Sequence, residues 1–237
     1  MTNKIGKVYL IPCPLGDVHP LAVLPLSVKQ HIENIDHYIV EHEKEARRFI
    51  KSIVPEKKQS VLKIQQINKF TSPEEIPSML DPCFDGFDVG VISDAGCPGI
   101  ADPGARIVAN AHEKNIKVVP LVGPSSLLLG MMASGFNGQN FAFNGYLPIE
   151  KGERRAELKR LEKLSKDQNQ SQLFIETPYR NNQLLESMVE TLNPRTKISV
   201  ACDLTLATEY IKTSSVEEWK KIKVDLHKRP TLFILQG

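Results

Sequence analysis

The 237-residue sequence lacks the glycine patterns of the common nucleotide-binding loops. It contains neither Gly-x-Gly-x-x-Gly nor Gly-x-x-x-x-Gly-Lys-Ser/Thr, which argues against a bound dinucleotide or nucleoside triphosphate. It has no apolar run that approaches the roughly 18 residues needed to span a membrane. Its formal net charge is only +2, so charge alone implies no polyanionic partner. We therefore expect a soluble globular protein without a membrane segment.

Cysteine is also scarce. The four thiols, at Cys13, Cys83, Cys97 and Cys202, lie far apart and form no Cys-x-x-Cys pair. This spacing predicts reduced thiols in a cytoplasmic protein rather than a disulfide framework or a zinc site. The six histidines are scattered as well, so we expect no bound metal. The apolar run at residues 8–11 is too short for the core of a signal peptide.

Short apolar runs alternate with helix-compatible segments in the first half of the chain. We expect strands at residues 8–11, 37–40, 61–64, 89–93 and 117–121, and a helix that begins at Ser72-Pro73. Alternation of this kind predicts a parallel sheet that is covered on both faces.

The pattern changes after Gly123. Strands are expected at residues 141–146, 172–176, 197–202, 207–213 and 231–235, and some follow one another without a long helix between them. This arrangement favours a mixed sheet. The sequence therefore predicts an α/β protein with one domain at residues 1–122 and a second at residues 123–237.

The most informative loop, residues 93–104, follows the apolar strand at 89–92 and reads Ser-Asp-Ala-Gly-Cys-Pro-Gly-Ile-Ala-Asp-Pro-Gly. It is about twice as long as the usual strand-to-helix connection of roughly 2–6 residues. Two other loops, residues 12–17 and 122–126, also follow strands, and ligands of open α/β sheets bind beyond the carboxyl ends of the strands. The helix that begins after Gly123-Pro124 adds backbone amides suited to a carboxylate. A ligand with adenine, ribose and an amino-acid tail would use all three loops.

Six segments, in order along the chain, resemble the tetrapyrrole (corrin/porphyrin) methylase family of S-adenosylmethionine-dependent methyltransferases. The most specific is residues 93–104, which is similar to the family's Ser-Asp-Ala-Gly-Thr-Pro-x-Ile-x-Asp-Pro-Gly. The others are residues 12–17, 120–126, 145–148, 176–180 and 201–205. Within the family, the chain resembles the branch that 2′-O-methylates a cytidine ribose in small-subunit ribosomal RNA.

The resemblance implies a two-domain fold with a five-stranded parallel sheet followed by a smaller mixed sheet. It also implies S-adenosylmethionine bound in the cleft between the domains, and a homodimer. The cofactor contacts that it implies are Pro14, Ser93, Asp94, Ala95, Gly96, Cys97, Ser125, Ser126, Glu176 and Leu204. Tyr179 and Arg180, at the start of a helix in the second domain, are candidate substrate contacts.

One segment departs from the ribosomal RNA branch. That branch carries Glu-Asp-Thr-Arg after the second strand, where this chain has Glu41-His42-Glu43-Lys44. Residues 67–71 also lack both histidines of the branch's His-x-His-Asn-Glu segment. Since these segments are expected near the substrate, three hypotheses stay open: methylation of ribosomal or other RNA, methylation of a tetrapyrrole-like or other small molecule, and non-catalytic binding of S-adenosylmethionine.

The sequence does not identify a catalytic base. A hydroxyl that accepts a methyl group needs a proton acceptor in the transition state. Glu41, His42 and Asp102 are the candidates.

Overall fold

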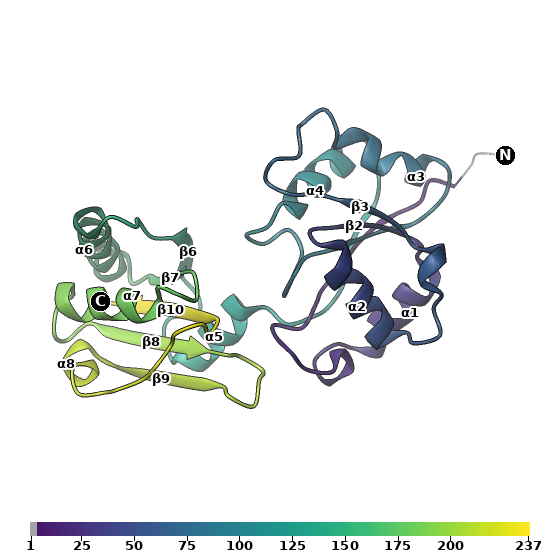
Figure 1. Cartoon of the computed structure of the whole chain (residues 1–237). Helices are drawn as coiled ribbons and strands as arrows, with labels where there is room; N and C mark the ends of the chain where they lie inside the picture. The colour runs from purple at the N-terminus through teal and green to yellow at the C-terminus, as the bar shows by residue number, and fades with distance from the viewer. Residues whose placement is uncertain (1–3) are drawn as a thin grey trace. The chain divides into compact units, whose positions relative to one another are not determined.

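The computed structural model describes residues 4–237, which form two compact units. The first unit runs to Ser125 and the second is Ser126–Gly237. Each unit has its own five-stranded sheet with helices packed on it (Figure 1).

The sheet of the first unit has the strand order β3-β2-β4-β1-β5, and all its neighbouring strands run parallel. The strands are β1 (Val8–Ile11), β2 (His37–Val40), β3 (Lys63–Gln66), β4 (Val89–Ile92) and β5 (Val118–Pro120). The central strand β4 is buried at every residue, as its unbroken apolar run predicts. The predicted five-stranded parallel sheet is confirmed.

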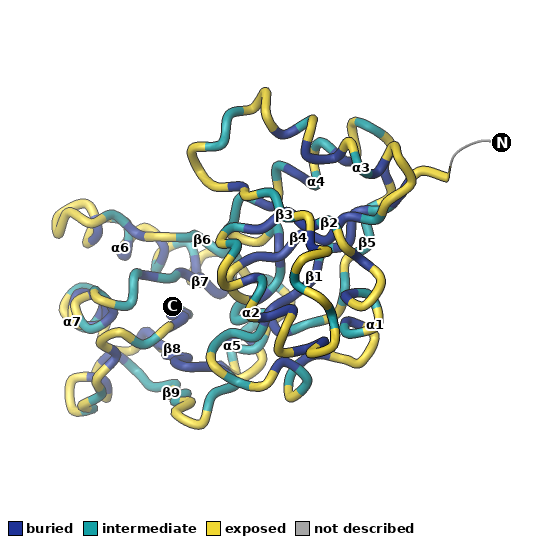
Figure 2. Tube along the Cα trace, turned by 45° about the vertical axis from the view of Figure 1, so that its right-hand side comes forward, coloured by how far each residue is buried: buried dark blue, intermediate teal, exposed yellow. Residues whose placement is uncertain are grey.

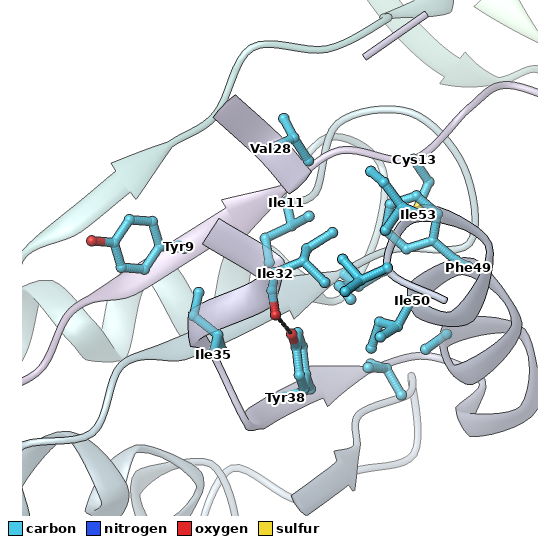
Figure 3. Packing of buried hydrophobic residues seen from close by; sticks show 14 of the residues in the cluster. Tyr9, Ile11, Cys13, Val28, Ile32, Ile35, Tyr38, Phe49, Ile50 and Ile53 are labelled. Atoms are coloured by element: carbon cyan, nitrogen blue, oxygen red, sulfur yellow. Dashed lines mark hydrogen bonds between the residues drawn. The ribbon is translucent and has the colours of Figure 1, made fainter. Parts of the chain in front are cut away.

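Helices cover both faces of this sheet. They are η1 (Pro20–Ala22), α1 (Leu26–Asn34), α2 (Glu43–Ile53), η2 (Gln59–Val61), η3 (Pro77–Leu80), α3 (Asp81–Phe84) and α4 (Gly104–Glu113). On one face, Ile32 of α1 and Ile50 of α2 pack with Tyr38, whose hydroxyl donates to the Ile32 carbonyl at 3.2 Å (Figure 3). On the other face, Ile107 of α4 packs with Leu80 of η3. The strands β1, β2 and β4 are mostly buried, whereas the edge strands β3 and β5 are more exposed (Figure 2).

The predicted helix at Ser72-Pro73 is wrong. The Glu75 carboxylate does accept the Ser72 N–H at 3.1 Å, as in a helix start, but the chain forms turns and then the short helices η3 and α3. Pro77 and Pro82 explain the difference, because each lacks the N–H that a continuous helix needs.

The second unit has a mixed sheet with the strand order β6-β7-β10-β8-β9. Its elements are α5 (Ser126–Ser134), β6 (Phe141–Tyr146), α6 (Lys151–Gln168), β7 (Ser171–Ile175), α7 (Asn181–Thr191), β8 (Lys197–Cys202), β9 (Tyr210–Ser215), α8 (Val216–Trp219) and β10 (Thr231–Gln236). Strands β6 and β7 are parallel, and the other neighbours are antiparallel, so the predicted mixed sheet is confirmed.

Strand β9 begins later than the predicted residue 207. Asp203 and Thr205 have positive φ angles, and Leu206 N–H donates to the Asp203 carbonyl at 3.0 Å. Residues 203–208 therefore make turns, and the chain becomes extended only at Tyr210.

Candidate functional site

Loops from the carboxyl ends of β1, β2 and β4 surround a hollow of about 500 Å³ in the first unit. The predicted site residues that line it are Pro14, Glu41, His42, Ser93, Asp94 and Ala95. Because β2, β4 and β1 are adjacent and parallel, the segments that follow them emerge at the same edge of the sheet.

The three loops singled out in the sequence are joined by hydrogen bonds. Cys13 and Gly96 pair through their backbones, which links the loop after β1 to the loop after β4. The Cys97 thiol donates to the Pro124 carbonyl at 3.4 Å, which links the loop after β4 to the loop after β5. The predicted convergence of these loops is confirmed as far as Pro124.

Gly96 gives this junction its shape. Its φ is 71°, in the left-handed region that glycine adopts without strain. A Cβ at this position would lie 3.3 Å from Leu15 Cδ2 and 3.6 Å from the Pro124 carbonyl oxygen. A side chain at this position would therefore press on both neighbouring loops, and glycine lets the three loops lie this close together.

Asp102 shapes the same loop from within. Both of its carboxylate oxygens accept the Gly99 N–H at 2.9 Å, and Oδ1 also accepts the Gly104 N–H at 2.7 Å. Burial raises the pKa of this carboxyl, and the hydrogen bonds from backbone amides oppose that effect. The carboxylate thus closes the turn that leads into α4.

Glu41, His42 and Asp94 form a charged cluster in the hollow. The Asp94 N–H donates to Glu41 Oε1 at 3.0 Å, and His42 Nδ1 lies 2.7 and 2.9 Å from the two carboxylate oxygens of Asp94. Burial raises the pKa of Glu41, and the hydrogen bond to Asp94 raises the pKa of His42. The cluster ties the segment after β2 to the loop after β4.

The thiol beside this cluster is inert. Burial raises the pKa of Cys13 above its ordinary value, and the charges of Asp94 and Glu41 raise it further. A thiol that stays protonated is a poor nucleophile.

In the second unit, Glu176 follows β7 and its side chain is 2% exposed. Its Oε1 accepts the Thr177 N–H at 2.6 Å and an Arg180 Nη2–H at 2.7 Å. Burial opposes the charge of this carboxylate, but the bonds from Arg180 and Thr177 prevail and lower the pKa of Glu176. Arg180 is therefore engaged in positioning Glu176.

Tyr179 lies next to this pair and is an exposed aromatic side chain. The His227 ring meets it edge-on at 5.8 Å between centroids, and Lys228 Nζ lies 5.8 Å from the Tyr179 centroid. His227 and Lys228 were not among the candidates predicted from the sequence. The basic run His227-Lys228-Arg229 was the signal that could have identified them.

Leu204, another predicted contact, is buried beside Asp203. Asp203 accepts bonds from Arg229 Nε at 2.7 Å and from the Thr208 hydroxyl at 2.8 Å.

Ser126 is the first residue of α5, where helix-start amides are available.

Within residues 4–237, no cluster of three or more histidine, cysteine or acidic side chains is arranged to hold a metal ion. Over that same range, no helix is both long and apolar enough to cross a membrane.

Residues 7–220 match the sequence profile of the tetrapyrrole (corrin/porphyrin) methylases. The chain is 28% identical to "Ribosomal RNA small subunit methyltransferase I" of Buchnera aphidicola, over 98% of this chain and 79% of that protein. It is 29% identical to the Bacillus subtilis protein of the same name, over 91% of this chain and 70% of that one.

A solved structure, that of the methyltransferase CobJ, has the same fold, with a TM-score of 0.64 at 15% identity. The similarity covers 98% of this chain and 94% of CobJ.

Proposed function

Because the chain belongs to the tetrapyrrole (corrin/porphyrin) methylase family, we propose that it methylates a ribose hydroxyl of RNA. The predicted S-adenosylmethionine-dependent methyltransferase activity follows from that family membership. The RNA substrate is supported by the names of the relatives from Buchnera aphidicola and Bacillus subtilis.

The methyl donor suits the junction of the three loops in the first unit. Glycine at position 96 lets the loops after β1, β4 and β5 lie close together, so that one adenosine with an amino-acid tail can contact all three of them. The residues of the first unit that would hold it are Pro14, Ser93, Asp94, Ala95, Gly96, Cys97 and Ser125. Ser126, Glu176 and Leu204 of the second unit stay predicted contacts.

The exposed group around Tyr179 also favours a nucleic acid. An aromatic face offers a stacking surface to an unpaired base, and Lys228 and His227 place a basic and a titratable group beside it. The exposed Tyr179 ring with His227 and Lys228 beside it is the structural observation that supports RNA as the substrate, in addition to the names of the relatives.

A small-molecule acceptor is the second candidate, because Glu41-His42-Glu43-Lys44 departs from the ribosomal RNA branch. The hollow is lined by acidic side chains, among them Glu41, Glu45 and Asp94, and by His42 and Arg48, so it offers charges of both signs to a small acceptor. The homodimer and the cytoplasmic location stay predictions.

The test is a methyl-transfer assay with labelled donor and three acceptors: total RNA, undermethylated ribosomal subunits and a metabolite extract. We expect label in RNA, at a ribose hydroxyl. Label in the metabolite fraction alone would favour the second candidate. Binding of S-adenosylhomocysteine without transfer to any of the three acceptors would favour a non-catalytic binding protein.

A further inference from the structure

His42 is held against Asp94 in a defined orientation. It follows β2, and Asp94 follows β4, the neighbouring strand of the sheet. Nδ1 of His42 contacts both oxygens of the Asp94 carboxylate, at 2.7 and 2.9 Å. The Asp94 backbone N–H donates to Glu41 Oε1 at 3.0 Å, so the backbone of Asp94 is also tied to the segment after β2.

This contact fixes the tautomer of the histidine. An ionised carboxylate only accepts hydrogen bonds, so the proton of neutral His42 must lie on Nδ1. The lone pair then lies on Nε2, at the opposite end of the ring. The His42 side chain is 69% exposed and lines the hollow, so Nε2 is accessible to a bound substrate.

The other two candidate bases are already engaged by backbone amides. Asp102 accepts bonds from Gly99 and Gly104 with its two oxygens. Glu41 accepts the Asp94 N–H and is half-buried. Of the three, His42 combines exposure to the hollow with a partner that orients it.

We propose that His42 Nε2 is the general base of the methyl transfer and that Asp94 is its positioning residue. This inference rests on the proposed function. The bound donor supplies a sulfonium methyl group whose C–S electron pair stays with sulfur while the acceptor oxygen forms the new O–C bond. The hydroxyl proton moves to Nε2, and the Asp94 carboxylate stabilises the imidazolium that results.

The charge around His42 sets the pH at which it can act. Asp94 on the loop after β4, Glu41 beside it in the chain and Glu45 on α2 all raise the pKa of His42, and Asp94 has the largest effect. Asp17, His19 and Arg48 line the same hollow. A base works in its neutral form, so methyl transfer should rise with pH through the raised pKa.

The experiment compares the wild type with His42→Gln and Asp94→Asn in the labelled-methyl assay with RNA, from pH 5.5 to 9. We expect His42→Gln to lose about 100-fold or more in kcat, the lower end of what general bases contribute. Asp94→Asn should have a lower kcat, and its rise with pH should move to lower pH. The matched control His37→Gln removes a histidine from the opposite end of β2 and should keep the wild-type profile.

A second measurement needs neither donor nor RNA. Titration of the histidine ring resonances by NMR, with His42 assigned from the signal missing in His42→Gln, should show a raised pKa that falls in Asp94→Asn. An unchanged kcat and pH profile in His42→Gln, with an active wild type, would overturn the inference and leave a surface ion pair. A wild type that binds the donor but methylates no RNA would overturn the proposed function, and with it this inference.

Discussion

Cys13 and Gly96 exchange two backbone hydrogen bonds, with N···O distances of 2.9 and 3.1 Å. This pair of bonds is an isolated antiparallel bridge between two loops that leave parallel strands. It holds the loop after β4 against the loop after β1 at this point. The left-handed φ of 71° at Gly96 is what lets the chain turn at the bridge.

Replacing Gly96 by valine should weaken donor binding. A β-branched residue in the left-handed region costs about 1–2 kcal/mol, and its side chain would enter the space between Leu15 and Pro124. We expect S-adenosylhomocysteine to bind at least about 10-fold more weakly in Gly96→Val, by calorimetry, with little change in circular dichroism. The control Gly138→Val adds a side chain where no atom lies within 4 Å of the new Cβ. Equal affinity in Gly96→Val and the wild type would show that the loop does not contact the donor.

Removing the partner of Asp203 should destabilise the second unit. Asp203 is buried and has a φ of 50°, and Arg229 Nε donates to its Oδ2 at 2.7 Å. Arg229→Met leaves this carboxylate without its cationic partner, which costs roughly 1–3 kcal/mol. Urea denaturation should show that loss, whereas Arg195→Met, at an exposed position, should change stability by less than about 0.5 kcal/mol. Equal losses in the two variants would contradict the role given to the Asp203–Arg229 pair.

The two sheets could be predicted from the sequence because each strand is marked by a local run of apolar residues. The charged cluster of Glu41, His42 and Asp94 could not be predicted in this way. The short apolar run Val-Gly-Val-Ile of β4 is typical of a buried strand, and the loop that follows it is rich in glycine and proline. The contact between His42 and Asp94 joins residues that are 52 positions apart, so no local pattern encodes it. Both residues were candidates from the sequence, but the pairing of β2 with β4 in the folded chain is what brings them together. The failed helix at Ser72 shows the converse, because its local start signal is sound and the prolines that follow override it.

The Glu176–Arg180 pair makes the stability of the second unit depend on pH. The folded pKa of Glu176 lies below its ordinary value, so its contribution is complete above the unfolded pKa and is lost as pH falls through the folded one. Arg180→Gln removes the bond to Oε1 and should cost roughly 1–3 kcal/mol at pH 7. The difference from the wild type should shrink as the pH is lowered below 4 in urea denaturation series. A difference that stays constant over this range would show that the pair is not the source of the stability.

Tyr179 should contribute to RNA affinity through its ring and not through its hydroxyl. Stacking of a base on an aromatic side chain is worth about 1–3 kcal/mol, which corresponds to roughly 5- to 150-fold in affinity. Tyr179→Ala should lose affinity for single-stranded RNA by about this factor, measured by fluorescence anisotropy, and Tyr179→Phe should keep it. Binding of S-adenosylhomocysteine should be the same in both variants. Equal RNA affinity in Tyr179→Ala and the wild type would remove this surface from the binding site.

The segment after β2 should determine which RNA is methylated. Lys44 is exposed in the first turn of α2, at the position where the ribosomal RNA branch carries arginine. Arginine holds a phosphate with two parallel hydrogen bonds, whereas lysine offers a point charge without that geometry. A reacting hydroxyl misplaced by about 1 Å can react about 100-fold more slowly. We therefore expect this chain to methylate the usual small-subunit ribosomal ribose poorly while it binds the donor normally.

The measurement is 2′-O-methylation of that ribose in cells that lack the ribosomal enzyme and express this chain. Lys44→Arg should raise the methylated fraction above that of the wild type, because it restores the two-pronged contact to phosphate. The control Lys58→Arg changes an exposed lysine ahead of η2 and should leave the fraction unchanged. Full methylation by the wild-type chain would show that the departure at Glu41-His42-Glu43-Lys44 is harmless, and the ribosomal ribose would then be the substrate. Little methylation in every variant, with donor binding intact, would direct the search to other RNAs.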